Sequence, residues 1–132
     1  MPEMPSLSHV ALSVNDLTVS EPWYQRLFGV EPAMTLDDGP FRRRVFALAD
    51  GQLFGLTQHD GARAGSTFDV VAPGLDHVGF HCADRVAVAA WQTHLDQIGV
   101  VHSGIVEAPY GFALSFTDPD GNQLELFAPP EG

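Results

Sequence analysis

Lysine is absent from this chain, which has six arginines and 17 aspartates and glutamates. The net charge of −11 at pH 7 leaves no basic surface for nucleic acid or anionic membrane, so we expect neither as a partner. Cys82 is the single cysteine, which rules out a disulfide within the chain and favours a reducing compartment. The first residues lack the basic and apolar regions of a secretory signal, and no apolar run reaches membrane-spanning length. We therefore expect a cytoplasmic protein.

What the sequence does contain is an internal repeat. Leu7-Ser8-His9-Val10 returns as Leu75-Asp76-His77-Val78, an offset of 77 − 9 = 68. After a gap of two residues, Asp50-Gly51 returns as Asp120-Gly121, an offset of 120 − 50 = 70. Such self-similarity indicates two copies of one supersecondary unit. We predict one domain made of a first module over 6–59, a linker over 60–74 and a second module over 75–128.

Each module is predicted to run as a strand, a helix and then two or three strands. Residues 7–14 alternate in the manner of a half-buried strand, with an apolar set on one face: Val10, Leu12 and Val14. Asp16 can cap a following helix that ends near Gly29. The inward stripe predicted for that helix is Val19, Trp23 and Leu27. Two further strands are expected over 41–48 and 53–58, joined by the Asp50-Gly51 turn.

The second module follows the same plan. Val78, Phe80 and Cys82 form the apolar face of its first strand, and Asp84 can cap its helix. The helix carries an amphipathic stripe at spacings of three and four: Val88, Trp91, Leu95 and Ile98. Strands are expected over 110–116 and 123–128, with weakly patterned strands near 33–36 and 101–106.

Strand parity predicts a metal site. Because successive side chains alternate between the faces of a strand, His9 and His77 point away from the helix layers, and so does Glu125 in the last strand. Two imidazoles and a carboxylate on one side of a sheet are suited to Fe(II), Mn(II), Ni(II) or Zn(II), with positions left for substrate and water. The alternative is that all three are polar residues on solvated strand faces.

Further residues are candidates for substrate binding or proton transfer. The position equivalent to Glu125 in the first module is 125 − 70 = 55, where Gly55 either vacates a ligand position or marks a bulge or close backbone approach. His81 shares the parity of His77 and is a candidate general acid or base, or else a structural histidine. Tyr110 is a candidate hydrogen-bond donor to substrate, or else a rim aromatic. The remaining candidates for lining the substrate site are Arg42, Arg44, His59 and Phe112, with the arginines alternatively guarding an edge strand.

The chain resembles the vicinal oxygen chelate superfamily, which includes glyoxalases, bleomycin-resistance proteins and extradiol dioxygenases. The matching segments are residues 7–17, 23–30, 75–80 and 116–127, with Phe-Thr-Asp-Pro-Asp-Gly-Asn-Gln-Leu-Glu-Leu-Phe as the longest. The resemblance implies an α+β fold in which two tandem βαβββ modules form an open, strongly curved mixed sheet around a metal. It carries the ligand positions over to His9, Gly55, His77 and Glu125. Since glyoxalase I has a ligand where this chain has Gly55, lactoylglutathione lyase activity is not implied.

Two functions follow from the resemblance. The first is a divalent-metal-dependent enzyme, glyoxalase-like or dioxygenase-like, that chelates neighbouring oxygens of a small substrate. The second is a metal-free binding or sequestration protein of the bleomycin-resistance kind, whose cavity holds an aromatic ligand. A homodimer is expected in either case.

Overall fold

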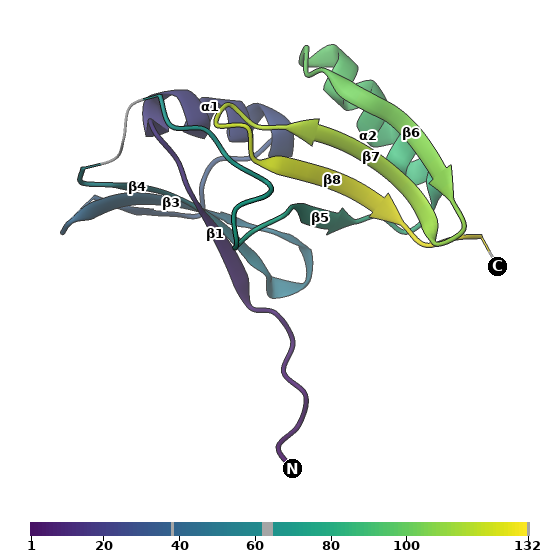
Figure 1. Ribbon diagram of the computed structural model, residues 1–132, viewed down its shortest axis with the longest axis horizontal. Coiled ribbons are helices and arrows are strands. Elements are labelled where there is room, and N and C mark those ends of the chain that lie inside the picture. The colour runs from purple at the N-terminus through teal and green to yellow at the C-terminus, as the bar shows by residue number, and fades with distance from the viewer. Residues whose placement is uncertain (38, 62–64, 132) are drawn as a thin grey trace. The chain divides into compact units, whose positions relative to one another are not determined.

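The structure is a computed structural model that describes residues 1–37, 39–61 and 65–131 (Figure 1). The chain divides into two compact units, Met1–Ser66 and Thr67–Gly132. The boundary between them falls inside the predicted linker. None of the helices in the described ranges is long and apolar enough to span a membrane.

The first unit is a four-stranded mixed sheet with one helix. Its elements are β1 (His9–Ser13), α1 (Leu17–Phe28), β2 (Met34–Leu36), β3 (Phe41–Ala47), a short 3-10 turn (Ala49–Gly51) and β4 (Leu53–His59). The strand order is β1-β4-β3-β2, with β1 parallel to β4 and the other pairs antiparallel.

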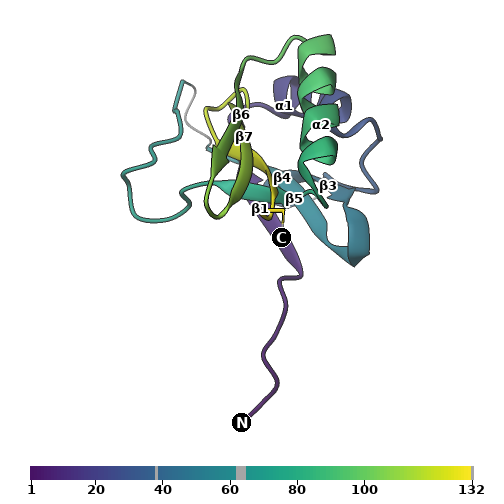
Figure 2. The ribbon, with the colours of Figure 1, turned by 90° about the vertical axis from the view of Figure 1, so that its right-hand side faces the viewer.

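The second unit repeats this plan. Its elements are β5 (Val78–His81), α2 (Arg85–Gln97), β6 (His102–Ala108), β7 (Gly111–Thr117) and β8 (Gln123–Ala128). The strand order is β5-β8-β7-β6, with β5 parallel to β8. Helix α2 packs along β6, β7 and β8 (Figure 2). The predicted α+β class and the tandem βαβββ order are confirmed as two open mixed sheets.

Both helices begin and end where the sequence predicts. The Asp16 carboxylate accepts a hydrogen bond from the Thr18 amide at 2.9 Å, and Asp84 accepts one from the Ala87 amide at 2.9 Å. These bonds satisfy amides that have no partner inside the helix. Helix α1 ends at Gly29, whose φ of 71° is accessible to glycine without strain.

Helix α1 buries a different stripe from the predicted one. Val19 is 52% exposed, so its predicted inward position is wrong. The buried residues are instead Leu17, Ser20, Tyr24 and Leu27, spaced by three, four and three. The Tyr24 ring lies in the centre of this core, 5.3 Å from the ring of Phe54 and 6.4 Å from that of Phe46.

The core of the second unit follows the sequence more closely. Val88 and Leu95 of α2 are fully buried, as are Leu114 and Leu124 on the sheet beneath. Cys82 is 5% exposed and lies on this apolar side, as predicted. Burial, together with the charge of Asp84, raises the pKa of the Cys82 thiol. The thiol is therefore an unreactive core group.

Candidate metal and substrate site

Each sheet has one face covered by its helix, and we call the opposite face the helix-free face. Parallel pairing aligns Ala11 of β1 with Gly55 of β4, and antiparallel pairing aligns Gly55 with Val45 of β3. Since paired residues share a face, the helix-free face of the first unit is fixed by register. It carries His9, Ala11, Ser13, Phe41, Arg43, Val45, Gly55, Thr57 and His59.

His9 begins β1 on this face and is exposed, as parity predicts. Its Nδ1 lies 3.0 Å from the hydroxyl of Ser8. Because this contact occupies Nδ1, Nε2 is the ring nitrogen that remains to bind a ligand.

Glu125 occupies the helix-free face of the second sheet. It pairs with Gly79 of β5 on one side and with Ser115 of β7 on the other. A Cβ built on Gly79 meets nothing within 4 Å, so the neighbouring strand leaves space beside the Glu125 carboxylate. Within the described part of the chain this carboxylate has no hydrogen bond or ion pair.

A buried turn fixes the strand that presents Glu125. The Asp118 carboxylate accepts hydrogen bonds from the backbone amides of Asp120 and Asn122, each at 2.9 Å, and from the Asn122 side chain at 2.8 Å. Asp118 and Asn122 are 5% and 6% exposed. Because this network sets where β8 begins, it also sets the register of Glu125.

His77 lies directly before β5, two residues from Gly79. Alternation places it on the same face as Gly79 and therefore diagonal to Glu125, at a Cα separation of about 8 Å for adjacent strands. Its Nδ1 lies 2.7 Å from the carboxylate of Asp76. A carboxylate on one ring nitrogen is the usual way in which a metal-binding histidine is oriented through the other.

The structure thus groups two of the three predicted metal ligands, His77 and Glu125, on one face of one unit, and His9 belongs to the other unit. Among the residues described, no three histidine, cysteine, aspartate or glutamate side chains come together within either unit. The donor set itself fits a borderline divalent ion, since neutral imidazole and carboxylate are its preferred ligands.

Gly55 is a position of close approach rather than a bulge. Its pairing with Ala11 and Val45 is regular, and a Cβ added to it would lie 3.2 Å from the Cβ of Ala11. Gly55 itself supplies no side-chain ligand.

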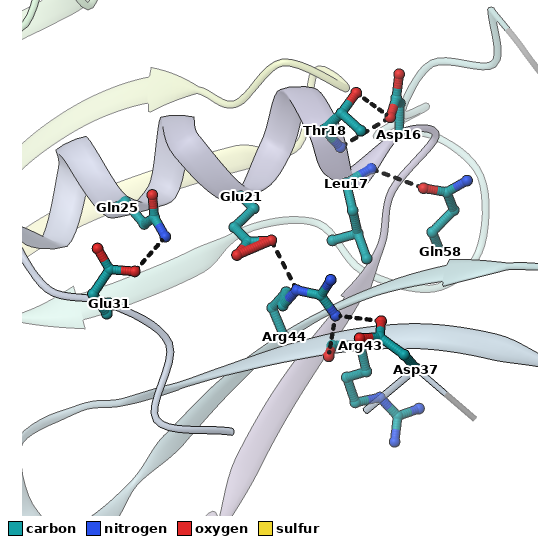
Figure 3. A network of polar contacts seen from close by, with 10 residues as sticks. All are labelled: Asp16, Leu17, Thr18, Glu21, Gln25, Glu31, Asp37, Arg43, Arg44 and Gln58. Carbon is teal, nitrogen blue, oxygen red and sulfur yellow. Dashed lines mark hydrogen bonds and ion pairs between the residues drawn. The ribbon is translucent and has the colours of Figure 1, made fainter. Parts of the chain in front are cut away.

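The structure places Arg42 and Arg44 on the helix-covered face. The prediction that they line the substrate site on the helix-free face is therefore wrong. Arg44 donates to Glu21 of α1 at 2.8 Å and to Asp37 at 2.9 Å (Figure 3). The hydrogen bond to Asp37 raises the pKa of Arg44 most, and Glu21 adds to it against the opposing effect of burial. Arg42 pairs with Gln58, which binds the first amide of α1, so it shares that face.

Phe112 is also placed differently from the expectation. It is 5% exposed and pairs with Ala128 on the side that α2 covers, and the guanidinium of Arg85 lies 5.9 Å from its ring. Phe112 is therefore a core residue and does not line the helix-free face.

The other candidates do lie on helix-free faces or at their edges. His59 pairs with Phe41, and their ring centres are 6.1 Å apart. His81 is exposed and pairs with Phe127. The Tyr110 ring is 70% exposed and stacks on Phe127 with ring centres 6.3 Å apart.

Comparison with known proteins identifies the family. Residues 6–126 match the model of the Glyoxalase/Bleomycin resistance protein/Dioxygenase superfamily. The chain belongs to this superfamily. No curated protein matches the sequence.

Solved structures agree with this assignment. A glyoxylase/bleomycin resistance protein/dioxygenase domain from Frankia sp. EAN1pec is 28% identical, with 98% of this chain and 96% of that chain covered and a TM-score of 0.88. A lactoylglutathione lyase from Agrobacterium tumefaciens is 22% identical over 96% of each chain, with a TM-score of 0.72. The fosfomycin resistance protein FosX from Listeria monocytogenes is 20% identical over 97% of this chain and 94% of its own, with a TM-score of 0.73. The last two show likeness of fold alone.

Proposed function

We propose that the protein is a divalent-metal-dependent enzyme of its superfamily, acting on a small substrate that offers two neighbouring oxygens. His9, His77 and Glu125 are the proposed ligands, and the metal is Fe, Mn, Ni or Zn. Bound there, such an ion supplies Lewis-acid stabilisation of an enolate or oxyanion. The absence of a ligand side chain at Gly55 argues against lactoylglutathione lyase chemistry and leaves a lyase, isomerase or dioxygenase reaction.

One observation carries this proposal. The Glu125 carboxylate, which has no partner among the described residues, lies beside the open space at Gly79, with His77 diagonal to it and oriented by Asp76. A solvated pair of polar residues needs neither the glycine nor the oriented imidazole. Together they resemble half of a metal site that keeps positions for substrate.

Two more residues have proposed catalytic roles: His81 in proton transfer and Tyr110 in hydrogen bonding to the substrate. His81 is exposed on the same face as Glu125, where its imidazole is the proposed general acid or base. The hydroxyl of Tyr110 is held at the edge of this face by stacking on Phe127, where it can donate a hydrogen bond to a substrate oxygen.

A second function is favoured by the aromatic pair itself. An exposed tyrosine stacked on Phe127 is a surface on which a planar ligand can lie without any metal. This supports the metal-free binding protein as the alternative. The two functions separate on whether the protein needs a metal.

Metal content tests the proposal. Untagged protein purified without chelator, and after reconstitution with each of the four metals, is measured by mass spectrometry beside Glu125→Gln and His77→Ala. We expect about one metal per site in the native protein and a loss of at least about tenfold in occupancy in both variants. Glu107→Gln is the matched control, because Glu107 is exposed and pairs with Phe112 on the helix-covered side.

The outcomes separate the two functions. Metal retained in Glu125→Gln, or no metal in the native protein after reconstitution, overturns the proposal and favours the binding protein. Light scattering on the same preparations tests the homodimer that membership of the superfamily leads us to expect.

A further inference from the structure

We propose that Arg43 is the recognition residue for a carboxylate, carried by a ligand that lies on the helix-free face of the first unit. As a statement of substrate class this rests on the proposed function, but the binding itself requires no metal.

The Arg43 guanidinium is held in place by two contacts. Its Nε donates to the hydroxyl of Thr57 at 2.8 Å, and its central carbon lies 4.3 Å from the centre of the Phe41 ring. Thr57 is 2% exposed, so the hydroxyl is a fixed anchor rather than a mobile surface group. A flexible side chain is thereby ordered before any ligand arrives, which reduces the entropy lost on binding.

The same contacts leave the binding end of the guanidinium available. With Nε engaged, Nη1 and Nη2 remain, and they present parallel N–H donors that match the two oxygens of a carboxylate. Within the described ranges, neither nitrogen has a hydrogen-bond or ion-pair partner.

Charge balance distinguishes Arg43 from its two neighbours in β3. Arg44 is neutralised by Glu21 and Asp37, and Figure 3 shows its guanidinium turned toward α1, whereas that of Arg43 points to the other side of the strand. The hydrogen bonds from Thr18 lower the pKa of Asp16 most, and the nearby charge of Arg42 lowers it further. Arg43 alone among the three faces away from these acids.

Among the described strand residues, the face that carries Arg43 holds no acid to balance its charge. The described strand residues that register places there include no aspartate or glutamate, and the only other titratable groups among them are His9 and His59. Strands β1 to β4 contain no aspartate or glutamate on either face, but on the helix-covered side Glu21 of α1 and Asp37 reach Arg44. An anionic ligand at this position therefore meets the Arg43 guanidinium without competition from a carboxylate of the described strands.

The surroundings indicate what the carboxylate is attached to. Phe41 is half-buried under the guanidinium, Val45 is 9% exposed, and Gly55 contributes no side chain to the same stretch of sheet. The His59 ring stands edge-on to Phe41 at 6.1 Å. These residues form an apolar, partly aromatic floor beside one cation, which suits an aromatic or apolar carboxylic acid.

Benzoate is the probe, and benzamide is its neutral counterpart of the same shape. Binding to the protein as purified is measured by calorimetry and by the NMR signal of the Arg43 Nε–H group. We expect saturable binding of benzoate, a shift of that signal, and binding of benzamide weaker by about tenfold or more, as loss of a charge-assisted contact implies.

Variants assign the binding to the residue. Arg43→Gln is expected to weaken benzoate binding by about tenfold or more, and Arg43→Lys to recover only part of it, because an ammonium lacks the fork held by Thr57. Arg42→Gln is the matched control, with the same charge change one residue away on the opposite face, and is expected to bind within about twofold of wild type. Thermal melts confirm that each variant folds.

Several results overturn the inference. These are no saturable binding of benzoate, equal binding of benzamide, or unchanged binding by Arg43→Gln. Binding of inorganic phosphate in place of benzoate, lost in Arg43→Gln, would replace the carboxylate with a phosphate group and refute the substrate class. Metal content keeps the two proposals distinct: Glu125→Gln is expected to lose metal and keep benzoate, and Arg43→Gln the reverse.

Discussion

The close contact between β1 and β4 yields a quantitative prediction for Gly55→Ala. A methyl group at this position would lie 3.2 Å from the Cβ of Ala11, about 0.3–0.8 Å inside the separation at which two carbon atoms attract most. The backbone of Gly55 is not in the left-handed region, so strain there does not add to the effect. Crowding of this size costs about 1–2 kcal/mol, at the low end for overpacked sites.

A second term opposes this crowding. Replacing a strand glycine by alanine removes conformational freedom from the unfolded chain, which is worth about 0.5–1 kcal/mol. Gly55→Ala should therefore lower the free energy of unfolding by about 0.5–1 kcal/mol. For a chain of 132 residues this is a fall in Tm of about 2–4 °C.

The double variant with Ala11→Gly is the decisive measurement. Ala11→Gly alone should cost about 1 kcal/mol through added chain entropy. In the double variant the methyl group has moved from one strand to the other, so the crowding disappears and the stability returns close to wild type. The coupling energy is then about 1.5 kcal/mol by urea unfolding, and additivity within about 0.5 kcal/mol would refute the contact.

Two more predictions concern the second sheet and the first helix. Gly111→Ala should destabilise the protein by about 2 kcal/mol or more in urea unfolding, because its φ is 147° and the new Cβ would lie 2.2 Å from the carbonyl oxygen of Ala128; a variant as stable as wild type would contradict this. Hydrogen bonds from the Thr18 side chain and amide lower the pKa of Asp16 below its ordinary value of 3.8. The unfolded chain therefore takes up this proton first as pH falls, so the stability due to the Asp16 charge is present above about pH 4 and lost as pH falls through the folded pKa. The difference in Tm between wild type and Asp16→Asn should be positive at pH 6 and shrink below pH 4, and a difference independent of pH would contradict it.

The fold could be predicted largely because the repeat and the helix caps are local signals. Asp16 and Asp84 each precede an amphipathic stretch, and their capping roles need only neighbouring amides. The prediction of the inward face of α1 was wrong because Val19 has the side chain of a typical core residue and Ser20 does not. Burial of Ser20 depends on how closely the helix approaches the sheet, which no short pattern encodes.

In the candidate site, too, local patterns predict some placements and strand pairing decides the others. Parity suffices for His9, because its strand alternates clearly between apolar and polar residues. Parity alone does not tell which of the arginines face the helix, because Val45 and Phe46 are both buried and β3 has no single apolar face. Only pairing with Thr57 assigns Arg43 to the helix-free face. The Tyr110–Phe127 stack was missed because the two rings are far apart in the sequence and give no periodic signal.

The two helix-free faces differ at equivalent positions, and this has a consequence for engineering. At the repeat offset of 70, Gly55 corresponds to Glu125 (55 + 70 = 125) and Arg43 to Ala113 (43 + 70 = 113). Each copy thus carries a charged group where the other has a residue without one. Because Glu125 and Arg43 belong to different compact units, libraries around Glu125 can be screened for altered occupancy by the proposed metal, and libraries around Arg43 for altered binding of the proposed acid. Improved halves can then be recombined by exchange at the linker.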